Sequence, residues 1–113
     1  MFGQPRFAAM NALINDVFES ERVVVVAHRG SGGGSVAVNT ALAVRAALLQ
    51  GAAMVELDVT ASADGEFYCF HDGYEAESLG IDTNLQTLSA AEIDKLSYLW
   101  MDRPGRTARV EHL

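Results

Sequence analysis

The first twenty residues place apolar side chains at helical spacing. Five apolar residues recur every three or four positions, with polar residues on the other side of the helical wheel: Phe7, Met10, Ile14, Val17 and Phe18. This spacing predicts an amphipathic helix over residues 7–20. We expect its apolar face to serve packing rather than ligand binding.

An unbroken apolar segment follows at residues 23–27. Its four valines and one alanine have the length of a strand and show no alternation with polar residues. β-Branched residues in such a run are typical of a strand that is covered on both faces, as in a parallel sheet.

The next two elements complete a strand–helix–strand pattern. Asn39-Thr40 can cap a helix that begins near Ala41 and ends at Gly51. A second strand is expected over residues 53–60. The crossover in such a unit is almost always right-handed, and the two strands are then parallel. The pattern therefore predicts an α/β fold.

A third, aromatic-rich strand is expected at residues 67–70. Because the connection is short, this strand could form a hairpin with residues 53–60 or follow them around a bend. Residues 72–85 are polar and contain two glycines, and they predict a loop.

The last part of the chain predicts one more helix. Residues 89–92 read Ser-Ala-Ala-Glu, which matches a capping box at the start of a short helix. Residues 101–109 predict a second loop. Residues 110–113 indicate the start of a further element.

Composition then limits the classes of function. Of the 113 residues, 50% are hydrophobic and 20% are charged, and the formal net charge is −7. This composition suits one folded domain and excludes a disordered chain. The acidic balance argues against nucleic acid or an anionic membrane as a partner, because the net field repels phosphate polymers. Any phosphate chemistry must therefore use a local site.

Cysteine usage and the absence of long apolar runs indicate a compartment. The single cysteine, Cys69, cannot form an internal disulfide. No run approaches the roughly 20 apolar residues of a membrane-spanning helix, and the first residues lack a signal-peptide layout. We expect a cytoplasmic protein in which Cys69 is a small buried hydrophobe.

Side chains able to do chemistry gather where the predicted strands end. Arg29 offers a fixed fork of donors that matches phosphate oxygens, and His28 is a proton carrier near neutral pH. A solvated pair that merely begins a loop is an equal alternative. The stretch Gly30 to Gly34 could present N–H groups as an anion nest, although a flexible loop is the commoner use of such a sequence.

Two carboxylates lie on the second predicted strand. Glu56 and Asp58 are two positions apart and therefore project from the same face. Side by side on an otherwise apolar strand they would repel each other unless a cation compensates them. Oxygen ligands favour Mg²⁺, Ca²⁺ or Mn²⁺. The alternative is a polar face of an edge strand.

His71 ends the third strand much as His28 ends the first. A single histidine at a strand end is more often structural than catalytic. Two histidines, one arginine and a carboxylate pair at successive strand ends, however, combine a phosphate clamp, a metal site and two proton carriers. This combination indicates phosphodiester cleavage.

The sequence resembles the glycerophosphodiester phosphodiesterase family. The resemblance covers residues 23 to about 97 and rests on an ordered series of short motifs. These are Ala27-His28-Arg29-Gly30, Asn39-Thr40, Ala46, Gly51-Ala52, Val55-Glu56-Leu57-Asp58-Val59, Asp64-Gly65, Phe70-His71-Asp72 and Leu88-Ser89-Ala90-Ala91-Glu92-Ile93.

The resemblance implies a (β/α)8 TIM barrel and a reaction. A divalent cation, Mg²⁺ or Ca²⁺ with Mn²⁺ as an alternative, would assist the cleavage of a glycerophosphodiester to glycerol 3-phosphate and an alcohol. His28 and His71 would be the general acid and base, with their individual parts left open. Arg29 would bind the substrate phosphate, and Glu56 and Asp58 would ligate the metal.

This chain departs from the family pattern in two respects. Val38 stands where the family usually has a glutamate, and a TIM barrel takes about 250 residues. We therefore expect residues 22–113 to be the N-terminal portion of the barrel and residues 1–21 a helical extension. The remainder of the barrel or another chain would complete the site.

Other functions are compatible with the same residues. The fold could serve as a non-catalytic phosphate-binding or metal-binding domain that has lost its chemistry. It could also act on lysolipid head groups, as related phospholipases do. In each case the expected partner is a small molecule rather than nucleic acid.

Overall fold

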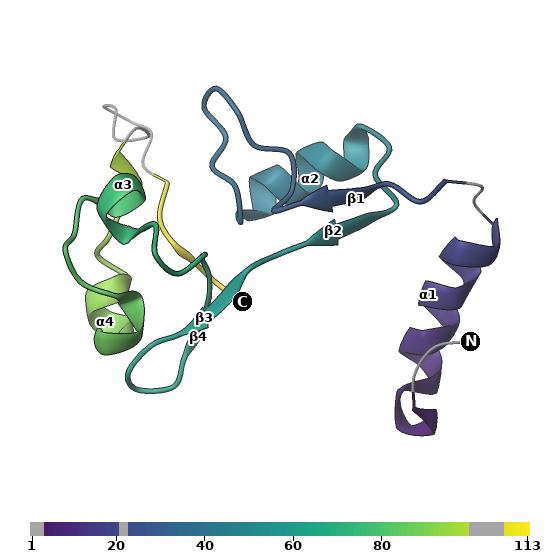
Figure 1. Cartoon of the computed structure of the whole chain (residues 1–113), viewed down its shortest axis with the longest axis horizontal. Coiled ribbons are helices and arrows are strands. Elements are labelled where there is room, and N and C mark those ends of the chain that lie inside the picture. The colour runs from purple at the N-terminus through teal and green to yellow at the C-terminus, as the bar shows by residue number, and fades with distance from the viewer. Residues whose placement is uncertain (1–3, 21–22, 100–107) are drawn as a thin grey trace.

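A computed structural model describes residues 4–20, 23–99 and 108–113. Figure 1 shows the arrangement of the elements along the chain. Their bounds are η1 (Pro5–Phe7), α1 (Ala8–Ser20), β1 (Val26–His28), α2 (Ala41–Leu49), β2 (Met54–Glu56), β3 (Val59–Ala61), β4 (Phe67–Cys69), α3 (Glu75–Leu79), η2 (Leu85–Thr87), α4 (Ala90–Ile93) and β5 (Glu111–His112).

The predicted parallel strand–helix–strand unit is confirmed. β1 pairs with β2 in parallel, and the register places His28 beside Glu56. Between them lies α2, whose N-cap is Thr40: the Thr40 hydroxyl accepts a hydrogen bond from the Ala43 N–H at 3.2 Å. Gly51, with φ +93°, follows the C-cap residue of this helix. Side-chain capping at one end and a glycine at the other set the bounds of α2.

The two open alternatives for the third strand are settled in favour of a hairpin. The predicted strand 53–60 divides at residues 57–58 into β2 and β3, and β3 pairs with β4 in an antiparallel manner. β5 adds to the other side of β4, also antiparallel. The further element predicted at residues 110–113 is therefore a short strand.

The core lies around β4. Eight residues form it, and Tyr68, Leu85 and Ile93 are fully buried: Ala37, Tyr68, Phe70, Leu79, Leu85, Ile93, Tyr98 and Val110. α4 begins with the predicted capping box, in which Glu92 accepts hydrogen bonds from the N–H and the hydroxyl of Ser89. Cys69 is buried with a free thiol, as predicted.

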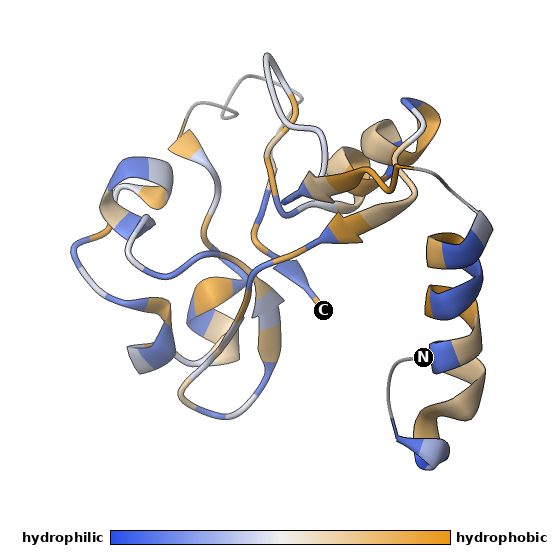
Figure 2. Ribbon diagram, turned by 45° about the vertical axis from the view of Figure 1, so that its right-hand side comes forward, coloured by the Kyte–Doolittle hydropathy of each residue, from blue (hydrophilic) through white to orange (hydrophobic). Residues whose placement is uncertain are grey.

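Two expectations about burial are wrong. α1 forms where its periodicity predicts, but none of its residues is buried, and Figure 1 shows the helix standing apart from the other elements. The strand predicted over residues 23–27 is shorter, because β1 begins only at Val26, and it is open rather than covered: Val26 is 50% exposed, and Val23, before the strand, is 76% exposed. β1 pairs with one strand, β2, and the two strands are mainly hydrophobic in Figure 2. Described residues do not cover the rest of this apolar surface.

The expectation of a simple loop at residues 72–85 is also wrong, because α3 forms there and η2 begins at Leu85. The carboxylate of Glu75 is buried and accepts hydrogen bonds from the N–H groups of Gly73 at 2.8 Å and Leu85 at 3.1 Å. Gly80 ends α3 in the left-handed conformation, with φ +70°. The predicted loop at 101–109 falls mostly outside the described residues.

One contact ties the C-terminal strand to α2. The Ala41 N–H at the start of α2 donates to a carboxylate oxygen of Glu111 at 2.7 Å. A carboxylate at this position satisfies a free N–H of the first helical turn. In the described part of the chain, none of the helices has the length and apolar character that crossing a membrane requires.

Candidate active site

The candidate site lies where β1 and β2 end. Because the parallel register pairs His28 with Glu56, both side chains emerge at the same edge of the sheet. His28 Nε2 lies 3.8 Å from Glu56 Oε2, and the two side chains are 72% and 45% exposed. The structure therefore brings the first predicted histidine and the first predicted carboxylate together in a place that solvent reaches.

Arg29 connects the two strand ends. Its backbone N–H donates to the Glu56 carbonyl at 2.8 Å and also contacts Glu56 Oε2 at 3.3 Å. Arg29 has φ +59°, an uncommon left-handed conformation for a residue with a side chain. Its Nε lies 2.7 Å from Asp58 Oδ2, with both side chains only 19% exposed. Nε makes no hydrogen bond of proper geometry, so this contact is an ion pair.

Asp58 has a second partner, Asn39. The Asn39 side-chain N–H donates to Asp58 Oδ2 at 3.0 Å, and Asn39 Oδ1 accepts from the Asp58 backbone N–H at 3.1 Å. The Asn39 backbone N–H also donates to the Arg29 carbonyl at 2.9 Å. Within the described residues, both side-chain contacts of Asp58 therefore use the same oxygen, Oδ2.

His71 approaches this group through an aromatic ring. Tyr74 packs edge-on against the His71 ring, with 5.1 Å between the two ring centres. The Arg29 guanidinium carbon lies 5.5 Å from the centre of the Tyr74 ring. His71 Nδ1 lies 2.7 Å from the Asp72 carbonyl oxygen. Because a carbonyl can only accept, Nδ1 carries the proton in a neutral His71, and Nε2 is then an acceptor.

A small cavity lies between the second carboxylate and the second histidine. It has a volume of about 200 Å³ and is lined by Asp58, Val59, Phe70, His71 and Asp72. Asp72 is held in turn by a hydrogen bond from the Gln86 side-chain amide. All five predicted site residues thus belong to one connected region. Glu56 contacts His28 and Arg29, and Arg29 contacts Asp58. Tyr74 and the cavity connect these residues to His71.

Three of the five N–H groups in the glycine stretch after β1 are used within the protein instead of forming the predicted anion nest. The N–H groups of Gly30, Ser31 and Gly33 already donate within the protein, to Ala27, Ala43 and Val36 respectively. Gly30 instead allows a close approach: a Cβ there would lie 2.7 Å from the backbone carbonyl carbon of Ala43. The stretch therefore packs the end of β1 against α2 rather than binding an anion.

Two residues of this region were not predicted from the sequence. Asn39 was expected only as a helix cap together with Thr40, and nothing in the sequence singled out Tyr74. The usable signal for Asn39 is its place directly before the true cap, Thr40, since asparagine tolerates the left-handed conformation better than most residues.

Comparison with known proteins identifies the family. The model of the glycerophosphoryl diester phosphodiesterase family matches residues 28–113. The chain belongs to this family. The match begins at His28, so α1 lies outside it. Among curated protein sequences, none matches the chain significantly.

Solved structures agree on the fold. A glycerophosphodiester phosphodiesterase from Agrobacterium tumefaciens is 35% identical, with a TM-score of 0.67, over 80% of this chain and 39% of that one. A candidate glycerophosphodiester phosphodiesterase from Galdieria sulphuraria is 22% identical, with a TM-score of 0.55, over 80% of this chain and 37% of that one. The chain thus spans about two fifths of their length, and the predicted fold class, part of an incomplete (β/α)8 barrel, is confirmed.

Proposed function

We propose that the protein hydrolyses glycerophosphodiesters to glycerol 3-phosphate and an alcohol with the help of a divalent cation. Residues 22–113 would supply the N-terminal portion of the catalytic barrel, and residues 1–21 a helical extension. The observation that carries the proposal is the group of Arg29, Glu56 and Asp58 at the ends of β1 and β2. Family membership supports it.

Arg29 is suited to bind the substrate phosphate. Its Nε is engaged by Asp58, and the donors of its two terminal nitrogens, which make no hydrogen bond within the described residues, would serve the ligand. Those donors match phosphate oxygens in geometry and charge. Because the left-handed backbone at Arg29 and the ion pair fix the base of the side chain, the guanidinium is oriented before substrate arrives.

Glu56 and Asp58 are suited to hold the cation. Among the residues that the structure describes, each uses one oxygen for its protein contacts, Glu56 Oε2 and Asp58 Oδ2, and the other oxygen of each carboxylate would face an outside ligand. Hard oxygen donors of this kind fit Mg²⁺ or Ca²⁺, with Mn²⁺ as an alternative. When bound, such a cation would neutralise charge on the phosphoryl oxygens.

Further ligands are needed to complete this cation site. Within residues 4–20, 23–99 and 108–113, His, Cys, Asp and Glu side chains do not form a group of three or more that could hold a metal ion. Two carboxylates fall short of the roughly six ligands that these cations take. We therefore propose that the remainder of the barrel or another chain contributes to the site.

The two histidines would move the protons. The tautomer of His71 leaves Nε2 able to accept a proton from the attacking oxygen. His28 would take the complementary part and protonate the leaving oxygen. Glu56 lies beside His28 and can orient its ring. Such proton transfer contributes about 10²–10⁴-fold to a rate.

The test uses the full-length protein and the release of glycerol 3-phosphate from glycerophosphocholine with Mg²⁺ or Ca²⁺ present. His71→Ala should lower kcat/KM by about 10²–10⁴-fold, and Glu56→Gln should weaken the calorimetric affinity for the cation. Glu77→Gln, an exposed carboxylate of α3, is the matched control and should leave both unchanged.

Three results would count against the proposal. Full activity in His71→Ala would remove that residue from the mechanism. Unchanged cation affinity in Glu56→Gln would do the same for the metal site. A wild-type protein that binds phosphate but shows neither cation binding at millimolar concentration nor diester cleavage would favour the non-catalytic alternative.

A further inference from the structure

Asn39 is held more tightly than a helix-flanking residue requires. It is 3% exposed and adopts the left-handed conformation, with φ +57°. The cap of α2 is Thr40, so Asn39 is not needed to begin the helix. The backbone N–H, the side-chain oxygen and the side-chain N–H of Asn39 instead form hydrogen bonds with Arg29 or Asp58.

The contacts form a closed arrangement around Asp58. The Asn39 side-chain amide forms two hydrogen bonds with Asp58: its oxygen accepts from the Asp58 backbone N–H, and its N–H donates to carboxylate Oδ2. A pair of bonds to both the backbone and the side chain of one residue restricts the rotation of that side chain. Oδ2 is thereby placed 2.7 Å from Arg29 Nε.

We infer that Asn39 is a positioning residue that orients the Asp58 carboxylate. In this role it directs Oδ2 to Arg29, so that Oδ1 has no polar contact with the other described residues. Its backbone N–H fixes the Arg29 carbonyl, so the same residue also positions the arginine. The inference rests on the proposed function, because it names how a cation ligand and a phosphate ligand are held relative to each other.

Few other residues could replace asparagine here. The position requires a donor and an acceptor on one short side chain, together with tolerance of a positive φ. Aspartate keeps the shape and the acceptor, but it loses the donor and places a second negative charge against Oδ2. Glycine keeps the backbone conformation and loses both side-chain bonds.

The experiment compares Asn39→Asp and Asn39→Gly in the full-length protein. Crystal structures of the variants report the orientation of Asp58. Calorimetry with Ca²⁺ reports cation affinity, and hydrolysis of glycerophosphocholine gives kcat and KM. Asn11→Asp on α1 is the control, because it makes the same change in net charge on an element that stands apart from the site.

The two variants should separate the two functions of the side chain. Asn39→Gly should release Asp58 from Arg29 and weaken Ca²⁺ binding by about 10–100-fold. Asn39→Asp should raise KM for the anionic substrate by about tenfold or more without weakening Ca²⁺ binding, because the added carboxylate opposes phosphate next to Arg29. Asn11→Asp should match the wild type.

A role in packing alone predicts a different result. Asn39→Asp, although it loses the donor to Oδ2, would then equal the wild type in KM and in Ca²⁺ affinity, and the inference would be overturned. An unchanged Asp58 orientation in the Asn39→Gly crystal structure would also overturn it. Absence of wild-type hydrolysis would count against the proposed function alone, because the crystal structures still test Asn39. If Asn39→Gly does not fold, the kinetics and structure of Asn39→Asp decide.

Discussion

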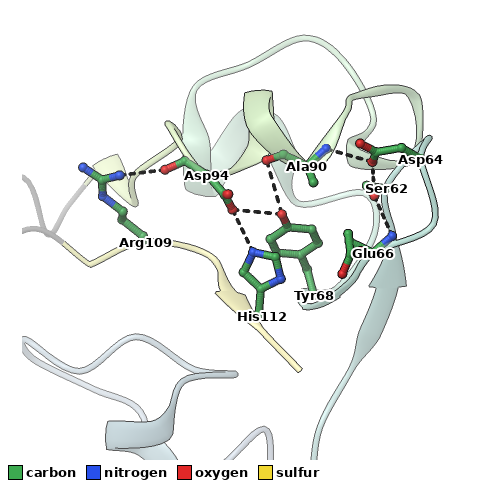
Figure 3. A network of polar contacts seen from close by, with 8 residues as sticks. All are labelled: Ser62, Asp64, Glu66, Tyr68, Ala90, Asp94, Arg109 and His112. Carbon is green, nitrogen blue, oxygen red and sulfur yellow. Dashed lines mark hydrogen bonds and ion pairs between the residues drawn. The ribbon is translucent and has the colours of Figure 1, made fainter.

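Two carboxylates in this protein have the same pattern of contacts and serve different ends. Asp94 Oδ1 accepts a hydrogen bond from the Tyr68 hydroxyl at 2.9 Å and lies 3.0 Å from His112 Nε2, and Figure 3 shows both contacts. Asp58 Oδ2 likewise has two partners: it forms an ion pair with Arg29 and accepts a hydrogen bond from Asn39. The number of partners therefore does not distinguish a structural carboxylate from a candidate ligand.

The surroundings of the two carboxylates make the difference. The partners of Asp94 belong to elements that are already packed together: Tyr68 on β4 is fully buried, and its ring lies 4.2 Å from that of His112 on β5. Burial and the Asp94 hydrogen bond raise the pKa of Tyr68 to about 12, so the phenol stays protonated. Asp94 thus joins the C-terminal end of α4 to β4 and β5, and the Arg109 guanidinium donates a hydrogen bond to its backbone carbonyl at 2.7 Å.

Asp58 lies at an opening instead. It lines the cavity of about 200 Å³ with His71, and its partner Arg29 contacts it through Nε. We conclude that a candidate ligand carboxylate is recognised by its position at a cavity, and not by the number of its contacts. The two parts of the molecule differ in the same way: the part around β4 has a buried core, whereas the part formed by β1, α2 and β2 leaves apolar side chains exposed.

The largest expected effect tests the contrast in packing. Ile93→Ala should lower the free energy of unfolding by about 2–5 kcal/mol, because Ile93 is fully buried beside β4. Leu49→Ala is the control, since Leu49 on α2 is 90% exposed, and its effect should stay within about 0.5 kcal/mol. Urea unfolding of the full-length protein measures both.

A large effect of Leu49→Ala would be informative in its own right. It would show that other parts of the complete barrel cover α2. The contrast in packing between α2 and the part around β4 would then hold only within residues 4–20, 23–99 and 108–113. A small effect of Ile93→Ala would contradict the position of the core.

A smaller effect is expected from Tyr74, which lies between Arg29 and His71. Tyr74→Leu removes the ring over the guanidinium, an interaction worth about 0.5–1 kcal/mol at an exposed site. It should therefore lower kcat/KM for a glycerophosphodiester about two- to fivefold. Tyr74→Phe keeps the ring and should stay near the wild type. Equal loss in both variants would assign the effect to the hydroxyl and contradict the stacking role.

Local signals in the sequence were sufficient for most of the elements, although not for α3 and η2, and for five members of the candidate site, although not for Asn39 and Tyr74. Thr40 and the Ser89–Glu92 capping box act over three residues, so the starts of α2 and α4 could be predicted. The site residues could be named because parallel strands end at one edge of a sheet, which brings His28 and Glu56 together whatever the rest of the fold.

Long-range contacts could not be predicted in this way. Asn39 and Asp58 are 19 positions apart, and their pairing depends on a left-handed backbone that the residue type permits but does not require. α3 depends on Glu75 bonding to Leu85, ten positions away. The burial of α1 was wrongly predicted for a related reason: periodicity shows which face is apolar and does not show what covers it.

The smallest expected effect concerns acid, and it tests whether the part around β4 depends on ionised carboxylates. Asp64 accepts hydrogen bonds from the Ser62 hydroxyl at 2.6 Å and the Ala90 N–H at 2.9 Å, and these lower its pKa below the ordinary 3.8. Bonds from the Ser89 N–H and hydroxyl lower the pKa of Glu92 below 4.5.

A carboxyl group with a lowered pKa in the folded state stabilises the fold above its ordinary value, and this contribution is lost as pH falls through the folded value. The wild type should therefore lose stability below about pH 4.5, measured by urea unfolding, more steeply than Asp64→Asn or Glu92→Gln. Those variants cannot ionise at these positions, so their curves should be flatter there. Glu77→Gln should follow the wild type. Parallel curves for the wild type and Asp64→Asn would show that the stability of the fold around β4 does not depend on this carboxylate. The contrast with Asp58, the candidate cation ligand, would then rest on packing alone.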